Sequence, residues 1–180
     1  MPNWVYNVIE MRSSDGEELV QFLKQHIVDG IFDFNTIIPE PKTEEDCPRE
    51  YNFNKSRGRF SCNADILENP PERKWFNWYD WRIEYWGTKW NSGGKQYFDY
   101  DKILKDEGYR SVRIHFQTAW SAPKPVFKKL LEMHKDLGDF AIDIMYYSTE
   151  NGECGGLYLC DGDINHYRWK FTDYYDEILK

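Results

Sequence analysis

The densest group of side chains that could bind a ligand is an aromatic block, WFNWYDWRIEYWG, at residues 75–87. Its pattern predicts a short helix in which Trp78, Trp81 and Tyr85 share one face, because successive helical residues turn by about 100°. Exposed rings of this kind stack on a sugar, a base or a partner protein. The opposite face would pack on the core and holds Trp75, Phe76, Tyr79, Ile83 and Trp86.

A second interpretation of this block remains open. Both aromatic faces can be buried, one on a sheet and one under the polar segment 40–74, because a small core gains much from large aromatic side chains. In that case Trp78, Trp81 and Tyr85 stabilise the fold and bind nothing. The same interpretation places Trp90 and Trp120 in the core.

The segment YRSVRIHFQTAW, residues 109–120, supplies the polar candidates. Strict alternation predicts a strand with Arg113, His115 and Gln117 on one face and apolar residues on the other. Arg113 and His115 would be the first polar groups of a cleft between the aromatic helix, the 40–74 segment and the sheet. The alternative is a solvated sheet face.

No pattern in the chain indicates a catalytic centre, a metal or a cofactor. The four histidines are widely spaced and none joins a Cys or Ser in a nucleophile motif; they are His26, His115, His134 and His166. The stretch DGDINH has the 1, 3, 5 spacing of a calcium loop. However, His166 stands where that loop needs Gly, and Thr172 where it needs Glu. A polar turn between strands explains it better.

Composition excludes several classes. The chain has 180 residues, 41% of them apolar, with 31 acidic and 23 basic side chains and a net charge of -8. This length fits one domain. No apolar run reaches the roughly 18–20 residues of a membrane span, and the start lacks a signal-peptide layout. The negative charge disfavours nucleic-acid binding, which needs a surplus of Lys and Arg.

The four cysteines predict reduced thiols in a cytoplasmic protein. No C-x-x-C pair occurs, so the spacings match no zinc motif. Cys154 and Cys160 lie in CGGLYLC; as a strand, this segment separates their Cα atoms by about 20 Å, beyond the roughly 7 Å limit for a disulfide. A bend at Gly155-Gly156 would shorten that distance.

Hydrophobic periodicity and turn residues predict a mixed α+β domain over residues 1–180, with an insertion at about 40–90. The expected order is a strand at 4–12, a helix capped by Ser13-Ser14-Asp15 and ending at Gly30, the aromatic helix, strands at 88–98 and 109–120, a helix at 121–138, and strands at 139–150, 155–164 and 166–171. Without the insertion this is βαββαβ, a ferredoxin-like sandwich with two helices on one face of a mostly antiparallel sheet.

Four segments together resemble a known family. MPNWVYN, FNTIIPEP, WYDWRIEYWGTKW and TAWSAPKPVFKKL resemble, in the same order, the YubB ferredoxin-like proteins of phages, plasmids and integrated elements. The resemblance implies the same fold and a mobile-element origin in a bacterium, but no catalytic mechanism. Residues 42–74 and the tail after Asp161 show no match.

We therefore expect a cytoplasmic mobile-element accessory protein that binds a host or phage protein and catalyses no reaction. The alternative is a small-ligand binder or enzyme that uses the cleft between the aromatic helix and the sheet. The sequence identifies neither the partner nor the oligomeric state.

Overall fold

The computed structural model describes residues 3–43, 46, 78–106, 108, 110–137, 140–148, 150, 152, 154–160 and 162–167. The expectations for Trp75, Phe76, Cys47, Cys62 and Thr172 lie outside these residues, as does most of the 40–74 segment.

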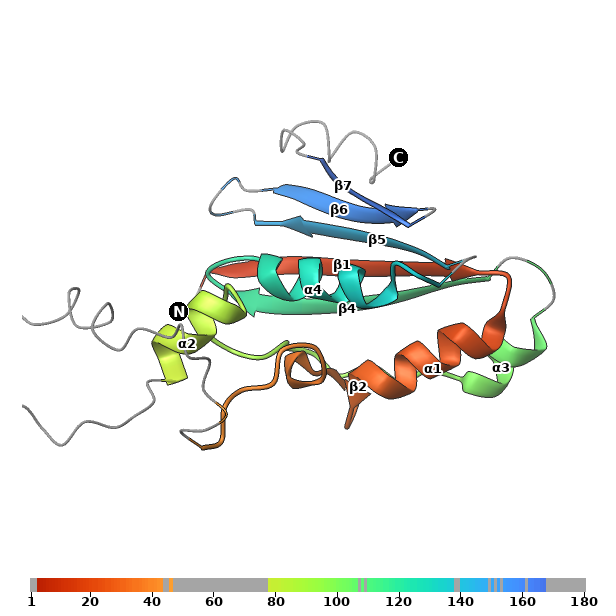
Figure 1. Cartoon of the computed structure of the whole chain (residues 1–180), viewed down its shortest axis with the longest axis horizontal. Coiled ribbons are helices and arrows are strands. Elements are labelled where there is room, and N and C mark those ends of the chain that lie inside the picture. Colours follow the sequence, from red (N-terminus) through yellow and green to blue (C-terminus); the bar gives the residue numbers. More distant parts are fainter. Residues whose placement is uncertain are drawn as a thin grey trace, which may run out of the picture.

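A five-stranded sheet in the order β4-β1-β5-β6-β7 forms the centre of the fold (Figure 1), and every neighbouring pair is antiparallel. Its strands are β1 Trp4–Ser13, β4 Arg110–Ala119, β5 Phe140–Tyr147, β6 Cys154–Cys160 and β7 Asp163–Tyr167. A separate hairpin joins β2 Ile27–Val28 to β3 Ile31–Phe32. The helices are α1 Gly16–His26, the 3-10 turn η1 Phe34–Thr36, α2 Trp78–Tyr85, α3 Tyr100–Lys105 and α4 Lys124–His134. The α+β class and the mostly antiparallel sheet are thus confirmed.

The sheet buries one face and leaves the other open. Along β1, residues at odd positions such as Ile9 and Met11 are fully buried, while Trp4 and Tyr6 on the other side are each 38% exposed. α1 and α4 both contribute to the same core cluster as Ile9, so both helices cover one face. This difference between the two faces appears as alternating burial along each strand, because successive side chains point to opposite faces.

The first helix begins as predicted and ends earlier. The Asp15 carboxylate accepts a hydrogen bond from the Glu17 backbone N–H at 2.8 Å, which is an N-terminal cap. The helix ends at His26, because Ile27 already pairs in the β2–β3 hairpin. Gly30 was expected to end the helix. It lies instead in the turn of that hairpin with φ +81°, a conformation that favours glycine.

The strand expected at 88–98 is wrong. This segment runs along the edge of β4, but only Gly93 forms a backbone bridge, to Gln117. Three residues on, the Gln96 side-chain amide takes the place of a peptide group: its oxygen accepts from the His115 N–H at 2.8 Å, and its nitrogen donates to the His115 carbonyl oxygen. A side chain thus covers part of an edge that would otherwise offer unpaired backbone groups.

Candidate functional site

Parts of the chain that are distant in sequence meet at one end of the sheet, which we call the tryptophan end (Figure 1): the start of β1, the end of β4, the residues after η1, and α2 with the residues that follow it. Trp4 begins β1 opposite Ala119, the last residue of β4. Thr88, directly after the aromatic helix, donates its hydroxyl to the Ala119 carbonyl at 2.8 Å. Ser121 donates to the Gly87 carbonyl, so segments distant in sequence are joined by hydrogen bonds. The tryptophans of this end are Trp4, Trp78, Trp81, Trp86, Trp90 and Trp120.

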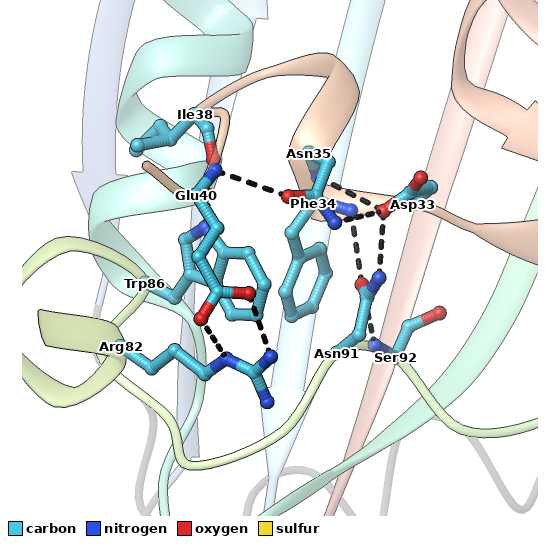
Figure 2. Close-up of polar contacts among 9 residues, drawn as sticks. All are labelled: Asp33, Phe34, Asn35, Ile38, Glu40, Arg82, Trp86, Asn91 and Ser92. Carbon is cyan, nitrogen blue, oxygen red and sulfur yellow. Dashed lines mark hydrogen bonds and ion pairs between the residues drawn. The ribbon is translucent and has the colours of Figure 1, made fainter. Parts of the chain in front are cut away.

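The interior of this end is built around Trp86, which is fully buried (Figure 2). Its indole N–H donates to the Ile38 carbonyl at 2.8 Å, and its ring packs edge-on against Phe34 with centroids 5.6 Å apart. The Arg82 guanidinium lies 5.0 Å from the Trp86 ring and donates to both oxygens of Glu40, at 3.0 and 2.6 Å. α2 is thereby fixed to the chain that follows η1.

A second set of hydrogen bonds fixes the chain that follows α2. The Asn91 side-chain oxygen accepts from the backbone N–H groups of Phe34 and Ser92, both at 2.9 Å. Its amide nitrogen donates to the Asp33 carboxylate at 2.6 Å (Figure 2). Residues 33–34 and 91–92 therefore form one rigid unit under the exposed tryptophans.

The Arg82–Glu40 pair gives a stability prediction. Replacing Arg82 with alanine leaves a carboxylate whose side chain is only 19% exposed without its partner. We expect a loss of about 2 kcal/mol in the free energy of unfolding, because a partly buried charge is left unpaired. Urea denaturation measures it. Lys129→Ala is the matched control: in its Lys129–Glu132 pair both side chains are exposed, 52% and 43%, and the pair should contribute below about 1 kcal/mol. Equal losses in the two variants would contradict this.

The exposed platform of Trp78, Trp81 and Tyr85 does not form. Trp81 is 1% exposed and stacks on Tyr85 at 5.0 Å, whereas Trp78 is 44% exposed. Ile83, which was assigned to the core face, is 41% exposed. The faces were misassigned because Asp80, Arg82 and Glu84 are interspersed among the apolar residues of α2, so periodicity could not select the buried face. For Trp81, burial in the core is the interpretation that holds.

Arg113 and His115 lie on the open face of the sheet. Arg113 donates to Glu10 at 3.0 Å, and the Ser111 hydroxyl donates to the same carboxylate at 2.8 Å. Burial opposes ionisation of Glu10, but these two hydrogen bonds and the charges of Arg113 and Arg12 lower its pKa below the usual value. The sheet separates this ionic group from the buried Trp81. The structure therefore does not bring Arg113, His115 and Trp81 into one cleft.

Instead, a continuous row of exposed and half-buried side chains runs from α2 to β1; we call it the exposed belt. Trp78 contacts Tyr79 with ring centroids 5.8 Å apart, and the Lys89 ammonium lies 5.6 Å from Tyr79 and 4.7 Å from Trp90. The Trp90 ring then contacts the Trp4 ring, with the two centroids 6.3 Å apart. Trp4 and Trp90 are 38% and 37% exposed. The sequence did not predict this role for either ring, because β1 has apolar residues on both faces, with Trp4 and Val8 opposite Val5 and Ile9.

The expectation that Trp90 and Trp120 belong to the core is wrong. Trp120 is 48% exposed and adopts φ +73°, which is uncommon for a bulky residue. It follows β4 directly, and its N–H donates to the Asn3 carbonyl at 2.8 Å. Of the tryptophans that the structure describes, only Trp81 and Trp86 are buried.

A second polar cluster joins the ends of α1 and α4 in the core. His26 is fully buried, His134 is 7% exposed, and their Nε2 atoms are 3.2 Å apart. Thr36 donates its hydroxyl to the Asp33 carbonyl at 2.7 Å, so it accepts from His26 Nδ1–H at 2.8 Å. His26 Nε2 is then the acceptor, and His134 Nε2–H is the donor. Both rings are neutral in this arrangement, in which His134 lies on the buried side of α4.

The described residues show no ligand set for a metal: no three His, Cys, Asp or Glu side chains among them are grouped to hold an ion. Cys154 and Cys160 lie in the same strand, β6, and neither forms a disulfide. Over the same described residues, no helix has the length and apolar character needed to cross a membrane.

Comparison with known proteins gives a similarity of fold alone. No family model and no curated protein matches the chain. A crystal structure of a protein api92 from Yersinia pseudotuberculosis, of the family DUF1281, is similar with a TM-score of 0.51 and 10% sequence identity. The similarity covers 94% of this chain and 98% of that chain, so the two share a fold over nearly their whole length.

Proposed function

We propose that this chain is an accessory protein of a phage or plasmid that acts in the bacterial cytoplasm by binding a host or phage protein. The exposed belt is its docking surface. The observation that carries the proposal is the contiguity of Trp78, Trp90 and Trp4, each more than a third exposed. Tryptophan is strongly enriched among the residues that dominate binding energy in protein interfaces.

The rigid interior supports this function. Trp86, the Arg82–Glu40 pair and the Asn91 hydrogen bonds hold the belt in place before a partner arrives. Preorganised anchors lose little conformational entropy on binding, so more of the contact energy appears as affinity. Exposed apolar side chains that form a contiguous patch also mark interaction sites more often than scattered ones do.

Charge favours a protein partner over a nucleic acid. In the described part of the chain two cations contact the rings of the exposed belt: Lys89 lies against Tyr79 and Trp90, and Arg82, 5.1 Å from the Trp78 ring, is paired with Glu40. Phosphate backbones are bound by several Lys or Arg side chains together, and the chain carries a net charge of -8. The alternative of a ligand cleft lined by Trp81, Arg113 and His115 loses support, since the sheet lies between them.

The order of elements supports the proposed ferredoxin-like topology. β4 and β5 are both antiparallel to β1 and lie on either side of it, with α4 connecting them. This is the split β-α-β arrangement of that fold. The segment from Gly93 to Gln96 lies along β4 where a further edge strand would pair. β6 and β7 extend the opposite side of the sheet.

Affinity capture from a bacterial lysate tests the function. We compare the wild-type chain with Trp78→Ala/Trp90→Ala and with a control, Tyr97→Ala/Leu104→Ala, whose side chains are also exposed but lie outside the belt. The belt variant should lose a specific partner at least tenfold, because each anchor contributes more than about 1 kcal/mol. Circular dichroism confirms that all variants are folded. Equal capture of the same proteins by both double variants would reject the belt as the docking surface.

A further inference from the structure

The open face of the sheet is a second surface, distinct from α2 and its loop. α1 and α4 cover the opposite face (Figure 1), and the open side of β1 presents Trp4, Tyr6, Val8, Glu10 and Arg12. Tyr6 and Trp4 are each 38% exposed, and the Arg12 side chain is 42% exposed. Along β1 the open face therefore has an aromatic end at Trp4 and Tyr6, a half-buried apolar centre at Val8, and an ionic end at Glu10 and Arg12.

The strand register places these side chains in levels across the sheet. At the level of Tyr6 lie Gln117 and Tyr147, and the Tyr6 and Tyr147 rings stack at 5.1 Å. The level of Val8 holds His115 and Met145. At the level of Glu10 lie Arg113 and Asp143. Arg12 comes next and lies 3.8 Å from the Asp143 carboxylate.

The size of the face suits a dimer. The strands β4, β1, β5, β6 and β7 have 10, 10, 8, 7 and 5 residues. With about 3.3 Å per residue and about 4.8 Å between strands, the face covers roughly 600 Å². Two copies would therefore bury roughly 1,200 Å², the lower end of the range for specific interfaces.

The face is complementary to itself about one two-fold axis. This axis lies between the two faces, runs perpendicular to the strands and passes over Val8. Each level of one copy then faces the level of the other copy that lies equally far from Val8 in the opposite direction along β1. Trp4 then meets Arg12, a cation over an aromatic ring. The Tyr6 hydroxyl meets the Glu10 carboxylate as donor to acceptor, and Val8 meets Val8. An axis along β1 would instead place Glu10 on Glu10 and Arg12 on Arg12, which like charges disfavour.

We propose that the chain forms a two-fold dimer through this open face, with β1 of one copy lying antiparallel over β1 of the other. The dimer goes beyond the proposed function and does not depend on it. It covers Trp4 at the end of the exposed belt, and it leaves Trp78 and Trp90 on α2 and its loop for a different partner.

Sedimentation over a range of concentrations tests the surface. The wild-type chain should sediment with twice the monomer mass. Val8→Asp puts two carboxylates on the axis and should raise the dimer dissociation constant at least 100-fold. Val28→Asp is the matched control, because Val28 is 43% exposed on the separate hairpin and should leave the dimer intact.

A charge rescue tests the arrangement. Arg12→Glu should weaken the dimer about tenfold, because it places a carboxylate against the negative face of the Trp4 ring. The double variant Trp4→Lys/Arg12→Glu should restore the affinity of the dimer, since the lysine at position 4 of each copy then faces the glutamate at position 12 of the other copy. Within one copy these positions are about 26 Å apart along β1, so the rescue must act between copies.

Each other result overturns the proposal. A wild-type chain that stays monomeric at about 100 µM shows no dimer of useful affinity. A dimer that Val8→Asp leaves intact uses another surface. A dimer that Val8→Asp breaks but the double variant does not rescue has another geometry. A monomer whose lysate partner is lost with Val8→Asp shows that the open face binds a different protein.

Discussion

Gly156→Ala is expected to lower the free energy of unfolding by about 3 kcal/mol and the melting temperature by about 10 °C. Gly156 is buried in β6, where a methyl group would overlap the Ile144 carbonyl oxygen on β5 and the ring of Tyr167 from β7. The carbonyl belongs to the backbone of a central strand, so it cannot move aside cheaply. Thermal and urea denaturation of the variant measure the loss.

The ring of Tyr167 explains why this position has no side chain. Tyr167 crosses over β6 at Gly156, and its hydroxyl donates to the Asp143 carboxylate at 2.7 Å. Gly93→Ala is the control, because its methyl group would meet only the Gln117 carbonyl at an ordinary 3.5 Å. A Gly156→Ala protein as stable as Gly93→Ala would show that β6 and Tyr167 are not packed this closely.

The neighbouring glycine has the same role on the other face. A Cβ at Gly155 would lie 2.7 Å from the hydroxyl of Tyr146, whose ring is buried on the helix side. Gly155-Gly156 could have been a bend that brings Cys154 and Cys160 together. The structure shows an unbroken strand in which each glycine makes room for one tyrosine. Sequence alone could not distinguish these cases, because a bend and a close approach both favour glycine.

The elements that the sequence predicted correctly are those whose type, helix or strand, is visible in the spacing of their own residues. β1 and β4 alternate along ten residues each, and α1 and α4 have apolar residues at helical spacing. No strand forms at 88–98, because the Gln96 side chain makes the hydrogen bonds to the His115 backbone that a paired strand would make with its own backbone. α3, with six residues, is too short to show a period.

The candidate site was predicted only in part, for a different reason. The sequence singled out the aromatic block, in which Trp78 is exposed and Trp81 is buried. Which other rings accompany it depends on contacts between distant segments: Trp90 and Trp4 reach the belt through Lys89 and the start of β1. No local pattern contains that information, because Trp4 and Trp90 are 86 positions apart in the sequence.

The buried pair His26–His134 should make stability depend on pH. Burial is the largest cause that lowers the pKa of His26 to about 4, and the charge of His134 adds to it. Burial also lowers the pKa of His134. The contacts that the structure describes are uncharged: the Phe22 ring centroid lies 4.7 Å from that of His26 and 4.8 Å from that of His134, and Thr36 supplies a neutral hydroxyl. A proton on His26 Nε2 would also face the N–H of His134.

The sign of the effect follows from where each state binds the proton. The unfolded chain protonates His26 near pH 6.5, whereas the folded protein does so only near pH 4. The contribution of His26 to the free energy of unfolding is therefore fully present above pH 6.5. It falls as the pH is lowered from 6.5 to 4, and it changes little below pH 4. The difference corresponds to about 3 kcal/mol for His26, at about 1.4 kcal/mol per pKa unit. Urea denaturation at a series of pH values measures the free energy of unfolding.

The double variant His26→Phe/His134→Phe isolates this contribution. It replaces both hydrogen-bond partners with apolar rings in a site already lined by Phe22 and Phe140, and removing both partners costs far less than removing one. Carboxylates titrate alike in the two proteins, so the difference between their curves reports the histidines. The variant should lose the fall between pH 6.5 and 4, whereas curves that stay parallel would show that the pair is not neutral in the folded protein.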